Sequence, residues 1–332
     1  MLQPGISIVI CTYNGTSRLS QTLKALAELD VTSVPSVELV LVDNASTDNT
    51  TSFVQSHWEM LGTPYPLTIL QETNPGKIHA QNHGLSRIKH SYALICDDDN
   101  ALFPDYLLKG YELLTSHSQI GALGGRGIVQ SEVPIPDWFE SMAYMYACAP
   151  QAQRTGDVRP TRNVIYGAGM FLNMTAYRQA LQKGFTFLLP SRTGTSVVTG
   201  AEDGEICWWL RFAGYEIWYG EELTFYHHIL PSRLTDEYHT KLLTMFRVGY
   251  PIGKLYLRIF NGELNKPIRF FWQKELVYTL ISFLKLPFQR IPEKDLEYKR
   301  CWAQMKYFLR HGKTYNEAYR KLLKIYLSLN HD

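Results

Sequence analysis

Apolar runs and polar segments alternate through the first hundred residues. Four β-branched, apolar runs, each followed by polar residues, are typical of buried strands and cover residues 6–11, 37–42, 67–71 and 92–96. Between these runs, the spacing of apolar residues predicts helices over 17–30, 48–58 and 77–88. Alternation of strands and helices predicts right-handed βαβ units, and therefore an α/β fold with a mainly parallel sheet flanked by helices.

The middle of the chain has a less regular pattern. Further strands are predicted over residues 121–129, 164–173, 217–219 and 223–228. A helix is predicted over residues 200–213, and its first turn contains Glu202, Asp203 and Glu205. Carboxylates are favoured in that turn because the helix macrodipole is positive there.

The C-terminal part of the chain differs from the rest in charge and in aromatic content. Residues 241–332 hold 18 basic and 7 acidic side chains, a net charge of +11, whereas residues 1–240 have a net charge of −9. This contrast predicts a catalytic domain over 1–240 and a basic, aromatic-rich helical region over 241–332. The longest apolar stretch of that region, residues 276–284, is much shorter than the roughly 20 residues that a membrane-spanning helix needs.

Cysteine usage and the N-terminus indicate the cellular compartment. The five cysteines are scattered and include no C-x-x-C pair, which argues against a disulfide framework and against a thiolate zinc site. The first residues lack the basic segment and the long apolar run of a signal peptide. We therefore expect a reducing, cytoplasmic location.

Polar side chains follow three of the predicted strands. They are Thr12-Tyr13-Asn14, Asp43-Asn44 and Asp97-Asp98-Asp99. Parallel sheets bind ligands beyond the carboxyl ends of their strands, so these groups are expected to converge on one site. Three adjacent carboxylates repel one another, and an oxygen-rich group of this kind suits Mg²⁺ or Mn²⁺ shared with a phosphate. The alternative is a solvated turn in which Asp99 or Asn100 caps the next helix.

Five blocks of sequence, in this order, resemble the family 2 glycosyltransferases. They are ISIVICTYN (6–14), VLVDNASTD (40–48), NPG (74–76) with AQNHG (80–84), CDDDN (96–100), and EDGE (202–205) with LRFAGY (210–215). The resemblance implies a GT-A-like fold, that of nucleotide-diphospho-sugar transferases, over residues 5–235. It also implies inverting transfer of a sugar from a nucleotide-diphosphate sugar, with UDP the favoured carrier, to a hydroxyl acceptor in glycan or glycolipid synthesis. The Q-x-x-R-W signature of processive synthases is missing, which predicts a single addition.

The same resemblance assigns roles to individual residues. Those implied to bind the nucleotide sugar are Thr12, Tyr13, Asn14, Asp43, Lys77, Asp97 and Asp98. Those implied to bind the divalent cation, Mn²⁺ or Mg²⁺, are Asp99, Asp97, His227 and His228. For Lys77 the alternative is a solvated helix face, and for each histidine it is a position without any ligand role. Trp138 and Arg192 are weaker candidates to border the acceptor.

The catalytic base is expected in the second acidic cluster. Asp203 matches the residue that acts as general base in inverting members, where it takes the proton of the acceptor hydroxyl. Glu202 is the alternative, because the sequence AEDGE allows the alignment to shift by one residue. From spacing alone, helix capping explains both carboxylates equally well.

The basic C-terminal region has features of segments that bind the surface of a membrane. A charged, aromatic and helical region without a span predicts peripheral contact with an anionic bilayer, with Phe270, Phe271 and Trp272 at the interface, and this would suit a lipid-linked acceptor. The alternative is a helical subdomain that packs on the catalytic body or forms a dimer.

Two other functions were compared with sugar transfer. A nucleotidyltransferase-like nucleotide-sugar enzyme would need a glycine-rich, basic phosphate loop after the first strand, and Thr12–Thr16 is not such a loop. The other is a catalytically degenerate protein whose basic tail binds membrane or nucleic acid. The chain contains no recognised nucleic-acid-binding motif and its larger part is acidic, so we expect no nucleic-acid partner.

Overall fold

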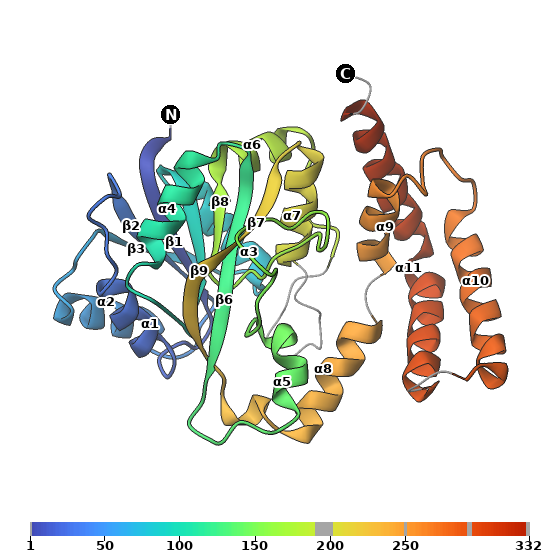
Figure 1. The fold of residues 1–332 in the computed structure, drawn as a ribbon, viewed down its shortest axis with the longest axis horizontal. Coiled ribbons are helices and arrows are strands. Elements are labelled where there is room, and N and C mark those ends of the chain that lie inside the picture. Colours follow the sequence, from blue (N-terminus) through green and yellow to red (C-terminus); the bar gives the residue numbers. More distant parts are fainter. Residues whose placement is uncertain (1, 190–201, 249–250, 291–293, 330–332) are drawn as a thin grey trace. The chain divides into compact units, whose positions relative to one another are not determined.

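The computed structural model describes residues 2–189, 202–248, 251–290 and 294–329. These residues form two compact units, which are described separately (Figure 1). The first contains the described residues up to Phe185 and those from Glu202 to Leu234. The second contains residues 186–189 and the described residues from Thr235 onward.

The described residues of the first unit form a nine-stranded sheet with the order β3-β2-β1-β4-β8-β6-β9-β5, in which β7 pairs with β9. The strands are β1 (Gln3–Thr12), β2 (Val37–Asn44), β3 (Leu67–Glu72), β4 (His90–Asp97), β5 (Asn100–Leu102), β6 (Ile120–Gln130), β7 (Gly156–Asp157), β8 (Met170–Asn173) and β9 (Glu216–His228). The half formed by β3, β2, β1 and β4 is parallel, as the sequence predicts. The other half is mixed, because β8 runs antiparallel to both β4 and β6.

Helices cover both faces of this sheet, which explains why its central strands are almost continuously apolar. One layer contains α1 (Leu19–Ala27), α2 (Thr50–Met60) and α4 (Tyr106–Ser116), and the other contains α3 (Lys77–Arg87), α6 (Met174–Gln182) and α7 (Glu202–Phe212). The first layer shares a core with every second side chain of β1 and β2, including Ile8 and Leu39. On the other face, a Cβ on Gly84 would lie 2.7 Å from Val9 Cγ1, so α3 can approach the sheet this closely only with glycine at that position.

Three predicted strands differ from those observed. The strand expected over 164–173 begins only at Met170, and residues 164–169 form an irregular loop. The backbone of Gly167 in this loop bonds to a side chain of α7 instead of a neighbouring strand. The two short strands expected over 217–219 and 223–228 are a single strand, β9. Short helical segments complete the unit: α5 (Phe139–Met142), η1 (Ala143–Tyr146) and η2 (Pro231–Arg233).

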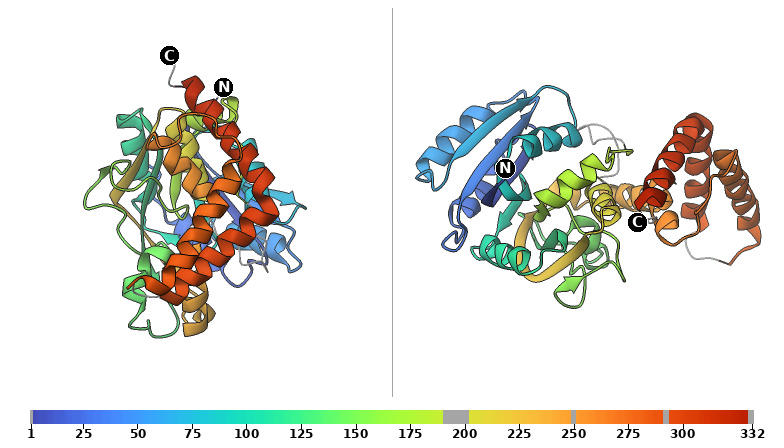
Figure 2. Two further views of the ribbon diagram at one scale, coloured as in Figure 1. Left: turned by 90° about the vertical axis from the view of Figure 1, so that its right-hand side faces the viewer. Right: turned by 90° about the horizontal axis from the view of Figure 1, so that it is seen from above.

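The second unit is helical, as predicted. Its elements are α8 (Asp236–Val248), α9 (Pro251–Phe260), α10 (Phe271–Lys285), η3 (Leu286–Phe288) and α11 (Lys294–Leu329), which is kinked at His311. Helices α10 and α11 run side by side (Figure 2), and Phe271 stacks between them on Tyr315 and Tyr319 with ring centroids 5.5 and 4.1 Å apart. Phe271 is therefore in the core of this unit and not at its surface, contrary to the sequence-based expectation. Within the described ranges, no helix has the length and apolar character needed to cross a membrane.

Candidate functional site

The three consecutive aspartates occupy the turn between β4 and β5. Asp97 is the last residue of β4, and Asn100 begins β5, where it lies opposite His227 of β9. The next helix, α4, begins only at Tyr106. The alternative in which Asp99 or Asn100 caps that helix is therefore wrong, and the turn lies at the carboxyl ends of β1 and β4.

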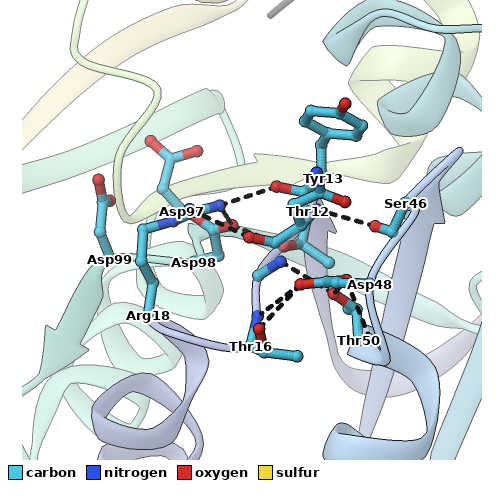
Figure 3. A network of polar contacts seen from close by, with 12 residues as sticks. Thr12, Tyr13, Thr16, Arg18, Ser46, Asp48, Thr50, Asp97, Asp98 and Asp99 are labelled. Atoms are coloured by element: carbon cyan, nitrogen blue, oxygen red, sulfur yellow. Dashed lines mark hydrogen bonds and ion pairs between the residues drawn. The ribbon is translucent and has the colours of Figure 1, made fainter.

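Asp98 is held by the segment that follows β1. Its Oδ2 accepts hydrogen bonds from Arg18 Nη2 at 2.7 Å and Thr12 Oγ1 at 2.6 Å, and its Oδ1 accepts one from Arg18 Nε at 3.2 Å (Figure 3). Burial raises the pKa of Asp98 above its ordinary value, although both donors favour the ionised form. Arg18 also donates to the carbonyl oxygens of Tyr13 and Asn14, at 3.0 and 3.2 Å. This one guanidinium therefore connects the loop after β1 to the aspartate turn.

Asp97 is paired with the first residue of α3. Lys77 Nζ lies 2.7 Å from Asp97 Oδ1 and 3.7 Å from Glu202 Oε1. The Lys77 side chain is 20% exposed, so it does not form a solvated helix face. It bridges the end of a strand and the first turn of α7, where Glu202 is buried.

Asp99 lies between two cations. Its Oδ1 is 3.4 Å from His227 Nε2, and its Oδ2 is 3.4 Å from Arg233 Nη1. Burial alone would raise the pKa of Asp99, but these neighbours outweigh it and hold the pKa well below the ordinary value. Burial alone would likewise lower the pKa of His227, but the Asp99 carboxylate outweighs that effect and raises it to about 10.

The two candidate histidines differ in orientation. His227 Nδ1 lies 2.7 Å from the carbonyl oxygen of Tyr146, and since that oxygen can only accept, Nδ1 carries the proton and Nε2 is directed at Asp99. His228 gives Asp99 only its backbone amide, which donates to the Asp99 carbonyl oxygen at 2.9 Å. Successive side chains of a strand point to opposite faces, so His227 is the histidine whose side chain lies beside Asp99.

The described residues contain no group of three or more His, Cys, Asp or Glu side chains placed to hold a metal ion. Asp99 supplies one oxygen, and His227 supplies one nitrogen beside it once a bound metal displaces the Nε2 proton, while the Tyr146 carbonyl holds the imidazole in place through Nδ1. Divalent cations that act on phosphates are commonly held by one or two protein groups, with phosphate oxygens completing the coordination. The residues therefore fit a partial cation site that a bound diphosphate would complete.

Asp203 is held by two backbone amides. Gly167 N donates to its Oδ2 at 2.8 Å, and Gly204 N donates to its Oδ1 at 2.8 Å. Asp203 is partly exposed, whereas the neighbouring Glu202 is 3% exposed and faces Lys77. Of the two carboxylates, Asp203 is therefore the more exposed.

The ends of β1 and β2 are joined into one polar edge. Asn14 has a left-handed backbone with φ of 50°, and its side-chain oxygen accepts from the Thr47 amide at 2.8 Å. Asp43 is buried and accepts hydrogen bonds from Ser46 N at 3.1 Å and Thr51 Oγ1 at 2.9 Å. Tyr13 is 49% exposed, and its ring projects from this network (Figure 3).

The structure brings most of the predicted residues to this edge and adds two that sequence reasoning missed. Arg18 and Arg233 were not candidates, because their acidic partners lie 80 and 134 residues away in the sequence and no local pattern marks either arginine. Of the weaker acceptor candidates, Trp138 packs near the rings of Phe139 and Tyr146, and Arg192 lies outside the described residues.

Comparison with known proteins gives the following matches. The model of the family described as glycosyl transferase family 2 matches residues 7–177, just over half of the chain. TuaG of Bacillus subtilis (strain 168), named as a glycosyltransferase of teichuronic acid biosynthesis, is 26% identical over 146 residues, which are 43% of this chain and 56% of TuaG. The poly(ribitol-phosphate) β-N-acetylglucosaminyltransferase TarS of Staphylococcus aureus (strain Mu50) is 25% identical over 131 residues, 38% of this chain and 22% of TarS.

Two solved structures share the fold. S. aureus TarS 1–349 in complex with UDP-GlcNAc matches with a TM-score of 0.51 and 15% identity, over 98% of this chain and 92% of that one. The mannosyltransferase PcManGT of Pyrobaculum calidifontis, in complex with GDP-Man and Mn²⁺, matches with a TM-score of 0.50 and 17% identity, over 99% and 86%. These likenesses confirm the predicted GT-A-like fold. The family match over residues 7–177, more than half of the chain, establishes that the chain belongs to glycosyl transferase family 2.

Proposed function

We propose that the protein transfers a single sugar from a nucleotide-diphosphate sugar to a hydroxyl group of a glycan or lipid-linked acceptor. The observation that carries this proposal is the aspartate turn, in which each carboxylate has a different partner. Asp98 is tied to Arg18, Asp97 to Lys77, and Asp99 to His227 and Arg233. The turn thus combines acidic groups with fixed cations, and both are needed near a diphosphate and its cation.

The donor is assigned to the edge formed by β1, β2 and β4. The exposed Tyr13 ring packs on the base, and Asp43 accepts a base N–H, since a carboxylate has about four acceptor positions and only part of them are used. Thr12 and Asn14 shape this pocket through their bonds to Asp98 and Thr47. UDP is the favoured carrier because TarS was solved with UDP-GlcNAc, and GDP is the alternative because PcManGT was solved with GDP-Man.

Asp99 and His227 are the proposed ligands of Mn²⁺ or Mg²⁺. Asp97 is a weaker candidate because Lys77 already neutralises it. When bound, the cation would stabilise the negative charge of the leaving nucleoside diphosphate. Arg233 and Lys77, on the two sides of the turn, add fixed positive charge for the same diphosphate.

Asp203 is the proposed general base. Its carboxylate takes the proton of the acceptor hydroxyl while the hydroxyl oxygen bonds to the anomeric carbon and the bond to the diphosphate breaks on the opposite side, which inverts the configuration. The amides of Gly167 and Gly204 hold that carboxylate in one orientation. TuaG is named for teichuronic acid biosynthesis and TarS for transfer to poly(ribitol-phosphate), so a cell-envelope polymer is the proposed class of acceptor.

Donor binding tests this proposal directly. Thermal unfolding is measured with UDP-, GDP- and dTDP-sugars, each with and without Mn²⁺. A ligand at 100 times its Kd stabilises the folded state by about 2.7 kcal/mol, and we expect this for one carrier in the presence of Mn²⁺. A folded sample that responds to none of the nucleotide sugars would contradict the proposal.

A further inference from the structure

Helix α10 is apolar on two opposite sides. One side packs inside the second unit, where Phe271 and Leu286 of the adjoining 3₁₀ turn are buried. The other side is exposed, and Phe288 in that turn is 89% exposed. The exposed aliphatic residues of α10 and the exposed phenylalanine of this turn form what we call the outer stripe, which consists of Val277, Leu280, Ile281, Leu284 and Phe288.

The spacing of the outer stripe places its members on one face. They follow one another at intervals of one, three or four residues, which in a helix produces neighbouring positions on a single side. When a helix has a second apolar side, that side is normally also covered by protein or by lipid. Nothing within the described part of the chain's second unit covers this stripe, because all five side chains are at least 41% exposed.

The exposed charged side chains of α10 itself are all positive. Lys274 and Lys285 are exposed residues of the same helix, three residues before Val277 and four residues after Ile281, respectively. Glu275 is the one acidic residue between 264 and 292 in the sequence, and it points inward, where it pairs with Arg258 at 2.8 Å. Residues 241–332 as a whole carry a net charge of +11.

We propose that the outer stripe of α10 docks on the surface of an anionic phospholipid bilayer. The apolar side chains enter the boundary between headgroups and acyl chains, and Lys274 and Lys285 contact lipid phosphates. The less favoured partner for the outer stripe is a second copy of this chain, bound through the same face in a two-fold dimer. It would bring the lysines of the two copies to the same interface, without an exposed carboxylate of α10 to compensate.

This surface differs from the aromatic group that the sequence suggested. Phe271 is buried, and Trp272 packs on Gly312 while its amide donates to Asn316 at 2.9 Å. The outer stripe begins six residues later in the sequence than Phe271. It belongs to the second unit and shares no residue with the proposed donor site, so bilayer binding does not depend on sugar transfer.

Co-sedimentation of the full chain with vesicles tests the proposal. Vesicles of phosphatidylglycerol mixed with phosphatidylcholine should bind the protein, and salt should weaken the binding because it screens the lysine contacts. The double variant Ile281→Asp/Leu284→Asp should bind at least about tenfold more weakly. A matched control is Leu181→Asp on α6 of the first unit, where an apolar side chain is 46% exposed, and it should bind as the unchanged protein does.

Further variants separate the contribution of the lysines from that of the apolar side chains. They also distinguish binding to a bilayer from binding to a second copy of the chain. Lys274→Gln and Lys285→Gln should each weaken binding to anionic vesicles by about fivefold, without affecting the weaker binding to pure phosphatidylcholine. Phe288→Ser, outside the helix, provides a second apolar test if the double variant does not fold. The proposal is overturned if the outer-stripe variants bind like the control. It is also overturned if light scattering shows a dimer that Ile281→Asp/Leu284→Asp dissociates while vesicles bind neither protein.

Discussion

The backbone amide of Gly167 donates a hydrogen bond of 2.8 Å to the carboxylate of Asp203, 36 residues further along the chain. This bond joins the irregular loop before β8 to the first turn of α7. It also explains why the strand predicted over 164–173 starts late, since the Gly167 amide is directed at a side chain and not at a neighbouring strand. The same contact orients the proposed base.

Substitution of Gly167 by alanine tests this orientation. A Cβ at position 167 would lie 3.0 Å from Asp203 Cβ and 3.3 Å from Asp203 Oδ2, so the carboxylate must shift. Misplacement of a reacting group by about 1 Å can reduce kcat by about a hundredfold, and because the shift required here is smaller, we expect kcat to fall by up to about tenfold. Steady-state kinetics should show the loss in kcat, with an unchanged Kd for the donor in calorimetry. An unchanged kcat would mean that the contact is only structural.

Asp203→Asn should abolish most of the transfer. Removal of a general base typically lowers the rate by about 10²- to 10⁴-fold, while the donor site at the other strand ends stays intact. Initial rates and donor calorimetry on the same preparation measure both quantities. The matched control is Glu202→Gln, and if that variant lost transfer while Asp203→Asn kept it, the two roles would have to be exchanged.

The Arg18–Asp98 pair should contribute to stability as well as to the shape of the donor site. The two side chains are 21% and 14% exposed, and Arg18→Gln leaves a largely buried carboxylate without its bidentate partner. We expect the free energy of unfolding to fall by roughly 1–3 kcal/mol. Urea denaturation of Arg18→Gln, Asp98→Asn and the double variant forms a double-mutant cycle. Strictly additive effects would show that the pair is not coupled.

The dependence on Mn²⁺ should distinguish the two adjacent histidines. His227→Gln and Asp99→Asn each remove a proposed ligand, and we expect the Mn²⁺ concentration for half-maximal donor-dependent stabilisation to rise at least about tenfold. Addition of EDTA to the unchanged protein should remove that stabilisation. His228→Gln should behave like the unchanged protein, because its side chain lies on the opposite face of β9. A larger effect at His228 than at His227 would reverse the assignment.

Acid should destabilise the fold through a buried group at the amino ends of the strands. Glu38 Oε1 accepts hydrogen bonds from Ser7 Oγ at 2.7 Å and Lys89 N at 3.0 Å, and His90 Nδ1 lies 2.9 Å from the same hydroxyl. Burial alone would raise the pKa of Glu38, but these donors hold it below its ordinary value of 4.5. Burial lowers the pKa of His90 below its ordinary value of 6.5.

The lowered pKa values of Glu38 and His90 both make the folded state less stable in acid. The unfolded chain binds more protons than the folded one, so the free energy of unfolding decreases as pH falls below 6.5 for His90, and again below 4.5 for Glu38. Urea denaturation across this range measures the decrease, and Glu38→Gln should flatten its lower part. A stability that does not change between neutral and acidic pH in the unchanged protein would contradict this prediction.

The sequence alone was sufficient to predict the alternation of strands and helices in the first hundred residues and the polar residues at the strand ends. These features are local, because the period of apolar residues and the residues that end a strand are determined by the chain's own geometry. The five motif blocks likewise pointed to the family that the family model then matched over residues 7–177. The helical character and positive charge of the C-terminal region were also evident from composition.

Tertiary structure decided which groups meet. The partners of Asp98 and Asp99 are Arg18 and Arg233, 80 and 134 residues away, and no local pattern determines such pairs. His227 lies beside Asp99 because β5 pairs with β9, on the far side of the antiparallel β8. This pairing determines which face of β9 is directed at the aspartate turn. Packing of α10 on α11 likewise buried Phe271 and exposed the outer stripe. In a helix with two apolar sides, the position of its neighbours decides which of the two sides remains at the surface.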